Sequence, residues 1–314
     1  MKVLKKIFKI LAVFFGTLSV LIFILAAYNQ IALKVEADRL SPPGQMVNMG
    51  GHKIHVYTEG KSQNALTLVL LSGSATVAPV YDFKPLYKLL SDEYKIAVVE
   101  KAGYGYSDIF EVKRDVNVMV NEVRTALRKA DVNPPYVLLP HSMSGLEAIY
   151  WSQQFPTEVS GIIGLDMATP SCYDNFDFSK VEKMIGLGHM AAKLGLIRIP
   201  GVYPLNQKGL SEEEIYQQKL LAYRNAVNID YIIEGKTVYD NAQMVKNNGD
   251  ISCPIIMFSS DGKEVGDFWI SAQKEYAQAN NAAIEIFDCG HYLHHHKSKE
   301  MSVTIKLFIK KING

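Results

Sequence analysis

Cysteine is scarce in this chain, which carries only Cys172, Cys253 and Cys289 among its 314 residues. An odd count of three is not a disulfide framework. Cys253 is expected to begin one strand and Cys289 to follow the end of a neighbouring parallel strand, so the two lie at opposite edges of a sheet. We therefore expect unbridged cysteines.

An excess of charge is also missing, since 33 lysines and arginines face 32 aspartates and glutamates, for a formal net charge of +1. Nucleic-acid-binding domains usually carry a clustered basic face. The glycine-rich segment KAGYGYSD (residues 101–108) lacks the spacing of a dinucleotide fingerprint, and no phosphate-loop lysine pattern occurs. We expect neither a nucleic-acid partner nor a cofactor.

The chain begins with a long uncharged stretch. Four lysines within the first nine residues precede residues 10–30, whose core ILAVFFGTLSVLIFILAA is just long enough to cross a bilayer as a helix. Positive charge on the N-terminal side favours a cytoplasmic N-terminus. We expect residues 1–30 to be a single-pass anchor in the cell membrane, residues 31–44 to be a linker, and the rest of the chain to be extracytoplasmic.

A secretory signal peptide, cleaved after Ala27, is the alternative for this segment. The apolar run is long for a signal peptide, and Leu25, three positions before the cut, is not the small residue that cleavage favours. The length favours an uncleaved anchor. Cleavage stays open as the second interpretation.

Apolar strand patterns alternate with helical patterns through most of the remaining chain. Two short strands around Gly50 and Gly51 indicate a hairpin. The later strands are continuous apolar runs, which are typical of a parallel sheet covered on both faces. These runs are residues 66–71, 95–100, 136–139, 159–166, 253–260 and 283–287. The sequence predicts an α/β fold with a mostly parallel central sheet flanked by helices.

The alternation stops after residue 166 and resumes near residue 251. The stretch between shows helical patterns, one of them begun by a capping box of Ser211 and Glu214. It is therefore an insertion between two strands of one sheet. We expect residues 45–166 and 251–314 to form the core, and residues 167–250 to form a helical lid over a cleft.

The segment VLLPHSMSG places Ser142 in a tight turn between a strand and a helix. A serine hydroxyl is a weak nucleophile that needs a base, and the carbonyl it attacks needs hydrogen-bond donors. A sharp turn lifts the hydroxyl clear of the sheet and puts the following N–H groups at a helix N-terminus. Such a turn requires small residues two positions away on either side, and here these are Pro140 and Ser144.

Four segments in order resemble the α/β-hydrolase superfamily. VLLPHSMSG resembles its nucleophile elbow, usually G-x-S-x-G, and LLSGSAT resembles its oxyanion loop. VVEKAGYGYSD resembles its glycine-rich turn, and DCGHYLH its terminal Gly-His segment. The resemblance covers residues 45–314. The departures are Pro140 and Ser144 in place of the two elbow glycines, and Ser72 in place of the usual histidine of the oxyanion loop; none removes a reacting group.

The resemblance implies that Ser142 is the nucleophile and His291 the general base. It also implies an oxyanion hole made by the backbone N–H groups of Ser74 and Met143. His141 is expected to pack beneath the elbow. The three histidines at 294–296 raise the question of a metal, but no cysteine or carboxylate accompanies them at ligand spacing and adjacent histidines diverge, so we expect no metal site.

The acid of the triad has two possible places in this family. In the loop after residues 253–260 the usual register falls on Lys263, with Asp261 two residues early and Glu264 one late. In the other, Asp166 ends the strand of residues 159–166, a position at which some haloalkane dehalogenases keep their acid. We prefer Asp166, with Asp261 and then Glu264 as alternatives.

These features predict a serine hydrolase, most simply an esterase- or lipase-like enzyme that forms an acyl-enzyme on Ser142. Its substrate would be a small-molecule ester or acyl compound. An aminopeptidase-like or acyl-transfer enzyme is an alternative, because a fold alone does not fix the reaction. A catalytically inactive binding protein is the third reading. Dehalogenases and epoxide hydrolases are disfavoured, because resemblance to them would require aspartate at position 142.

Overall fold

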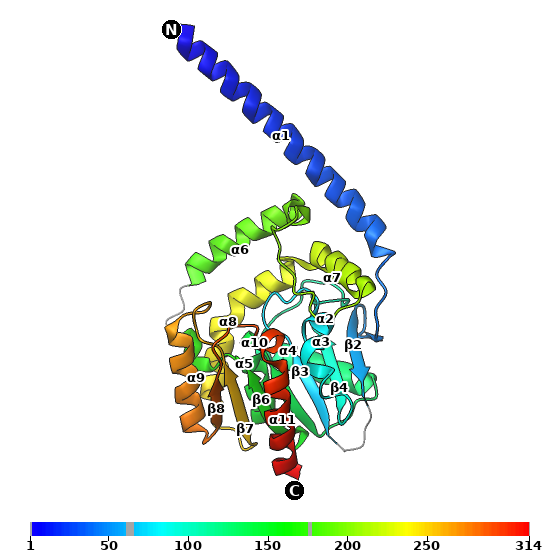
Figure 1. The fold of residues 1–314 in the computed structure, drawn as a ribbon, viewed down its shortest axis with the longest axis vertical. Coiled ribbons are helices and arrows are strands. Elements are labelled where there is room, and N and C mark those ends of the chain that lie inside the picture. Colours follow the sequence, from blue (N-terminus) through cyan, green and yellow to red (C-terminus); the bar gives the residue numbers. More distant parts are fainter. Residues whose placement is uncertain (1, 61–65, 175–177, 314) are drawn as a thin grey trace.

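The computed structural model of the protein describes residues 2–60, 66–174 and 178–313 (Figure 1). Its strands are β1 (Gln45–Asn48), β2 (Lys53–Glu59), β3 (Thr67–Leu71), β4 (Lys95–Glu100), β5 (Tyr136–Pro140), β6 (Val159–Leu165), β7 (Ile255–Ser259) and β8 (Ala283–Ile286). Within the described ranges they form one sheet in the order β1-β2-β4-β3-β5-β6-β7-β8. β2 pairs antiparallel with β1 and β4, and the other neighbouring pairs are parallel. The predicted hairpin and mostly parallel sheet are confirmed.

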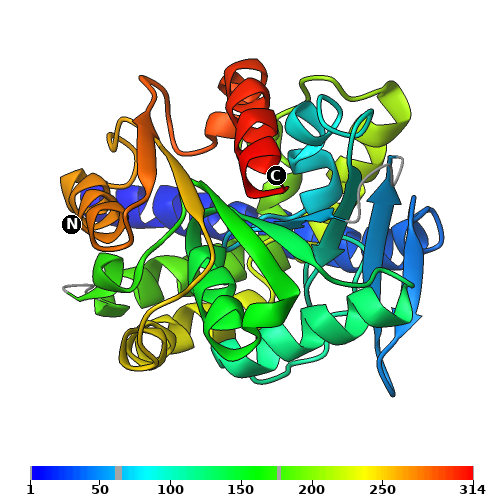
Figure 2. The same ribbon diagram turned by 90° about the horizontal axis from the view of Figure 1, so that it is seen from below.

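Helices cover both faces of this sheet. They are α2 (Pro79–Asp82), α3 (Lys84–Tyr87), α4 (Val116–Lys129), α5 (Gly145–Gln154), α9 (Asp267–Ala279), α10 (Leu293–His296) and α11 (Ser298–Asn313). Successive strand residues point to opposite faces. Val69 and Leu71 therefore pack with residues of α4 and α5, while Leu68 and Leu70 pack with residues of α3 and α11. Figure 2 shows α11 on one side of the sheet and α4 and α5 on the other.

Between β6 and β7 the described residues form helices and no strand (Figure 1). They are α6 (Phe178–Lys193), α7 (Glu212–Asn225), α8 (Ile229–Asn247) and the short turns Pro170–Tyr173 and Leu196–Arg198. α7 begins with the predicted capping box, in which Ser211 and Glu214 each accept the other's backbone N–H. The role of this insertion as a lid stays a prediction.

Buried charges attach α8 to the core. Lys101, just after β4, donates to Glu147 of α5 at 2.6 Å and to Glu234 of α8 at 2.8 Å. Arg114 lies 3.3 Å from Glu122 and 4.0 Å from Glu234. All five side chains are buried. Because a buried charge is costly unless it is paired, these contacts fix α8 against the sheet's edge.

The N-terminal helix α1 runs without a break from Lys2 to Ala37. The linker expected to begin at residue 31 is therefore wrong at its start, and only residues 38–44 join α1 to β1. Residues 31–37, IALKVEA, contain no glycine or proline and include good helix formers, so nothing in them stops the helix. By length and composition, residues 3–37 are long and apolar enough to cross a membrane.

Candidate active site

The turn after β5 places Ser142 at φ +54, in the left-handed region that side chains other than glycine rarely adopt. The strained turn is held by the backbone, since the Ala168 N–H donates to the Ser142 carbonyl at 2.7 Å. At Gly145 a Cβ would lie 2.1 Å from the Ala168 carbonyl oxygen, so only glycine fits there. Ser144, which stands where the family usually has glycine, is buried and donates to the Leu71 carbonyl at 2.7 Å. This departure from the family pattern adds a tether between the elbow and β3.

The structure brings His291 between Ser142 and Asp166. His291 follows β8, and its Nε2 lies 2.8 Å from the Ser142 Oγ. Its Nδ1 lies 2.7 Å from the Asp166 Oδ2. The Trp269 ring packs edge-on against the imidazole at a centroid distance of 5.6 Å. One imidazole thus contacts a hydroxyl with one nitrogen and a carboxylate with the other, which is the arrangement that activates a serine.

Asp166 is fully buried at the end of β6. Its second oxygen, Oδ1, accepts hydrogen bonds from three donors, which are the Ser260 N–H at 3.2 Å, the Trp269 Nε1 at 3.1 Å and the Gln273 Nε2 at 2.9 Å. Burial works to raise the pKa of Asp166, but the hydrogen bonds, the one with His291 above all, hold it below its usual value. The carboxylate is therefore kept ionised and oriented.

The two alternative acids lie elsewhere. Asp261 is partly exposed and accepts from the Lys263 backbone N–H at 3.0 Å and from its Nζ at 2.8 Å. Glu264 accepts the backbone N–H of His291 at 2.8 Å, and so contacts the chain beside the imidazole. A Cβ at Gly290 would lie 2.3 Å from a Glu264 oxygen, so a side chain there would displace the Glu264 carboxylate.

The loop after β3 touches the elbow. A Cβ built at Gly73 would lie 2.6 Å from the Ser142 Cβ, so this loop approaches the serine as closely as a backbone can. Ser74, whose N–H is one expected oxyanion donor, is the next residue along. Met143, the other, follows Ser142 in the first turn after β5. Their role as oxyanion donors stays a prediction.

His141 packs beneath the elbow, as expected. It is buried, and its Nε2 donates to the His291 carbonyl at 3.2 Å. Burial first, and the neighbouring His291 and His294 second, hold the pKa of His141 well below its usual value. A neutral imidazole there supports the His291 segment without contributing a charge.

The expectation that the histidines after His291 diverge, and that no carboxylate accompanies them, is wrong. His294 and His295 donate through Nε2 to the two oxygens of Asp82, at 2.8 and 2.9 Å. Burial would raise the pKa of Asp82, but the two imidazoles hold it far below its usual value. The ligand atoms of the three side chains lie within 4.8 Å of one another, and imidazole with carboxylate is a donor set that suits Zn²⁺. Spacing along the chain does not reveal this group, because Asp82 lies 212 residues before His294.

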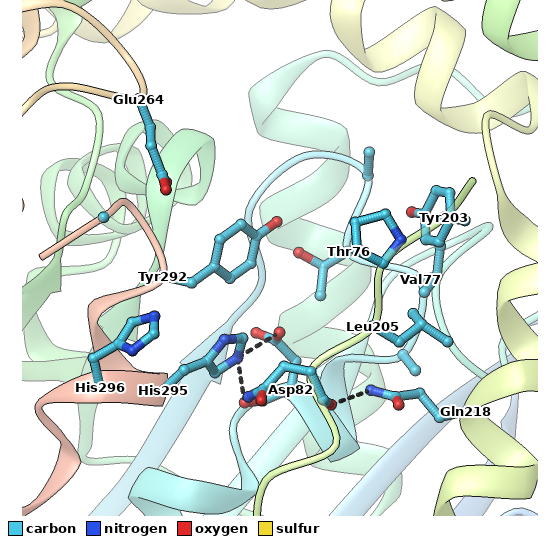
Figure 3. Close-up of a pocket in the computed structure, with 15 residues that line it drawn as sticks. Thr76, Val77, Asp82, Tyr203, Leu205, Gln218, Glu264, Tyr292, His295 and His296 are labelled. Carbon is cyan, nitrogen blue, oxygen red and sulfur yellow. Dashed lines mark hydrogen bonds and ion pairs between the residues drawn. The ribbon is translucent and has the colours of Figure 1, made fainter. Parts of the chain in front are cut away.

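A cavity of about 510 Å³ opens beside the triad. Part of its wall comes from core loops next to the candidate site, including Ala75, Thr76 and Tyr292. Tyr203 and Leu205, from the insertion, form another part. Figure 3 shows the Tyr292 ring projecting into this space with its hydroxyl toward Thr76. The insertion thus forms part of the wall of a cavity that also reaches Gly290 and Tyr292, the two neighbours of His291 in the chain.

No family model matches the chain. YbdG, a protein of Bacillus subtilis, is 34% identical over 324 residues, which cover 99% of this chain and 98% of YbdG. YqjL of the same organism is 30% identical over 112 residues, which cover 36% of this chain and 44% of YqjL. The relation to YbdG therefore spans both chains nearly from end to end.

Solved structures give the fold. A reconstructed ancestral haloalkane dehalogenase, AncHLD2, is similar with a TM-score of 0.65 at 17% identity, covering 86% of this chain and 99% of that chain. The enol-lactonase from Burkholderia xenovorans LB400 has a TM-score of 0.63 at 14% identity, covering 85% and 100%. A carboxylesterase of Nitrososphaera gargenis has a TM-score of 0.61 at 15% identity, covering 86% and 99%. The chain belongs to one family with YbdG, and it has the α/β-hydrolase fold that its four motifs indicated.

Proposed function

We propose that this chain is a serine hydrolase that cleaves carboxylic esters through an acyl-enzyme on Ser142. The observation that carries the proposal is the continuous hydrogen-bonded path from the Ser142 hydroxyl through the His291 ring to the buried Asp166 carboxylate. Relatives in fold that are named for ester or lactone chemistry support it. Serine at position 142 disfavours dehalogenase chemistry, because resemblance to dehalogenases would require aspartate at that position.

In the proposed reaction His291 Nε2 takes the proton from Ser142 as its oxygen attacks the ester carbonyl. The tetrahedral oxyanion is bound by the N–H groups of Ser74 and Met143. His291 then gives the proton to the departing alkoxide, which leaves an acyl group on Ser142. Water, deprotonated by His291, hydrolyses that ester and returns the serine. Asp166 holds the Nδ1-protonated tautomer and stabilises the imidazolium throughout.

A fluorophosphonate activity probe tests the nucleophile. The native chain should be labelled and Ser142→Ala should not be, since the probe reacts only with an activated hydroxyl. Ser144→Gly is the matched control: it restores the usual elbow residue, and the Ser144 hydroxyl already donates to Leu71 and His141. Undiminished labelling of Ser142→Ala would refute the assignment. Failure to label the native chain would favour the inactive binding protein.

The reaction type needs substrates. A series of p-nitrophenyl esters of rising acyl length, run beside amino-acyl anilides, separates esterase from aminopeptidase activity and measures the pocket. We expect ester cleavage only. The acidic residues that an aminopeptidase would offer, Glu212 to Glu214, begin α7, and Glu214 is paired with Lys84 and the α7 cap. Preference for the anilides would overturn the ester proposal.

We further propose that α1 is an uncleaved single-pass anchor in the cell membrane, with the hydrolase domain on the extracytoplasmic side. The length of its apolar stretch and the lysines before it support this. Protease added to intact cells should remove the domain. A domain that is protected until the cells are lysed would establish the opposite orientation, and a mature chain that begins after Ala27 would establish cleavage.

A further inference from the structure

Helix α6 and the turn after it present apolar side chains to the outside. Met184, Leu187 and Met190 of α6 are 72%, 67% and 56% exposed, and Ile199 and Val202 beyond it are 45% and 51% exposed. We call these five residues the α6 surface. Single exposed apolar residues are ordinary, but a contiguous group of them marks a contact site.

The opposite side of α6 faces the domain. His189 Nδ1 bonds the Val227 carbonyl at 2.7 Å, and a Cβ at Gly188 would lie 3.3 Å from the Val227 side chain. At about 100° per residue, Leu187 and Met184 lie roughly 160° and 140° around the helix from His189, and Met190 lies roughly 100° from it. The α6 surface is therefore directed away from the body of the protein.

The end of α6 is bound to α1. Asn29 of α1 donates through Nδ2 to the carbonyls of Ala192 and Lys193 at 3.2 and 3.3 Å. Arg198 donates from Nε to the Asn29 Oδ1 at 2.6 Å, and both its terminal nitrogens contact Glu36 at 2.7 Å. Asn29 is almost fully buried in this contact. The contact fixes where along α1 the insertion is attached.

That attachment point has a defined depth if α1 spans a bilayer. The apolar core, residues 10–27, is about 27 Å long as a helix, close to the roughly 30 Å of a hydrocarbon layer. Asn29 follows the core by two residues, so α6 meets α1 where the hydrocarbon ends. Figure 1 shows α6 running crosswise to α1, on the side of the domain from which α1 projects. A helix placed this way lies along the membrane surface.

The charges on α6 match such a surface. Helices that lie in a membrane interface combine large apolar residues with lysines that reach anionic headgroups. Lys183 and Lys193 are exposed on α6, and the exposed Glu182 of the same helix is paired with Lys236 of α8 at 3.5 Å. Ile199 and Val202 also lead directly into Tyr203 and Leu205, which line the cavity beside the triad. The segment that ends the α6 surface thus continues along the chain into the wall of that cavity.

We propose that the α6 surface docks into the lipid surface around α1, and that the esters cleaved at Ser142 are membrane-resident amphiphiles entering from that surface. The docking rests on the proposed span of α1, and the substrate class rests on the proposed ester hydrolysis. Lipid is the occupant because α1 itself brings the α6 surface to the bilayer edge.

Tryptophan fluorescence tests the docking without using activity. The full chain is reconstituted into phosphatidylcholine–phosphatidylglycerol vesicles with brominated acyl chains, which quench tryptophan on contact. Leu187→Trp should be strongly quenched. Leu307→Trp is the matched control, since Leu307 is 63% exposed on α11 at the opposite end of the domain, and it should behave like solvent. The native Trp151 and Trp269 are buried in the core and give the baseline. Equal quenching at positions 187 and 307, or a chain that does not enter the vesicles, would overturn the docking.

Activity tests the substrate class. In Leu187→Glu/Met190→Glu, hydrolysis of a long-chain ester carried in vesicles should fall by about tenfold or more, because two apolar contacts with lipid are lost. Hydrolysis of a soluble short-chain p-nitrophenyl ester should be unchanged, and Leu307→Glu should affect neither. Equal loss with both esters would overturn the proposal by showing a structural role. A native chain that cleaves neither ester would overturn the hydrolase function and the substrate class together, while the quenching result would still decide the docking.

Discussion

Two loops at the same edge of the sheet each carry an aspartate, and the structure treats them differently. The loop after β6 buries Asp166 and surrounds one of its oxygens with three donors while the other meets His291. The loop after β7 leaves Asp261 partly exposed and pairs it with Lys263, three-quarters of which is exposed. Burial and the donors on its far oxygen favour Asp166 over Asp261 as the acid of the proposed triad. The usual register of the acid in the loop after β7 predicts the acid less well.

Of the variants at these two loops, Asp166→Asn should lose the most activity. The amide would present an N–H₂ group to His291 and favour the wrong imidazole tautomer, so turnover of a p-nitrophenyl ester should fall by about 10⁴-fold. The fold should survive, because the side chain keeps its shape and can still accept through Oδ1; thermal unfolding of the variant checks this. Near-native turnover in Asp166→Asn would move the acid to the loop after β7.

Gln273→Leu removes one of the three donors to the far oxygen of Asp166. Burial works to raise the pKa of Asp166, and the Gln273 amide is one of the donors that hold it down. Because the acid acts in its ionised form, above its pKa, losing this donor should move the acidic limb of the kcat/KM profile to higher pH. Turnover at neutral pH should fall by about tenfold, as expected for one hydrogen bond to a charged group. Gln278→Leu, exposed on the same helix, should leave the profile unchanged.

Glu264 lies between the two cases, since it contacts the His291 backbone and not its ring. Glu264→Ala would leave that N–H without its acceptor, and turnover should fall by about fivefold, the worth of an ordinary hydrogen bond. Glu264→Gln keeps an acceptor oxygen and should stay close to native. A Glu264→Gln variant as inactive as Asp166→Asn would contradict the geometry and make Glu264 the acid.

The smallest effect is expected from Asp261→Asn. An aspartate in a turn with glycine after it has an adequate structural role, and its partner Lys263 is a solvated side chain. Turnover should change by less than about twofold. Initial rates with one ester, measured beside Asp166→Asn at equal protein concentration, decide between the two loops. A large loss in both variants would mean that Asp261 supports the site through its turn.

The site could be predicted from the sequence where it depends on residues that are close together in the chain. Ser142 belongs to a strand, a turn and a helix that are continuous in the chain, so the local pattern and its resemblance to a nucleophile elbow were enough to propose it. Preferring Asp166 needed its place at the end of a buried strand together with the resemblance to haloalkane dehalogenases that keep their acid there. The donors Trp269 and Gln273 lie 103 and 107 residues from it. No periodicity links them to Asp166, although a glutamine on the apolar face of α9 was a usable sign.

The fold shows the same limit. Each buried strand is a short apolar run, so the sheet follows from sequence by burial alone. The end of α1 is less evident: the apolar pattern ends near residue 30, whereas good helix formers continue the helix to Ala37, and Glu36 there pairs with Arg198, a partner 162 residues away. The hydrogen bonds of Asp82 with His294 and His295 could not be predicted from the sequence for the same reason. Pairings of distant polar residues are visible only once the chain is folded.

The buried charges beneath α8 have a consequence for how such a protein can be recombined. In sequence, residues 167–250 form a cassette with clear ends, and exchanging them between relatives is the simplest design for changing specificity. Glu234 is part of that cassette, but Lys101, Arg114 and Glu147 are not. A foreign cassette without the matching carboxylate would leave Lys101 with Glu147 alone and Arg114 with Glu122 alone, so two buried cations would share one carboxylate fewer, which is unfavourable. A viable chimera must therefore exchange Lys101 and Arg114 together with the helix, so the natural breakpoints of this insertion lie inside the core.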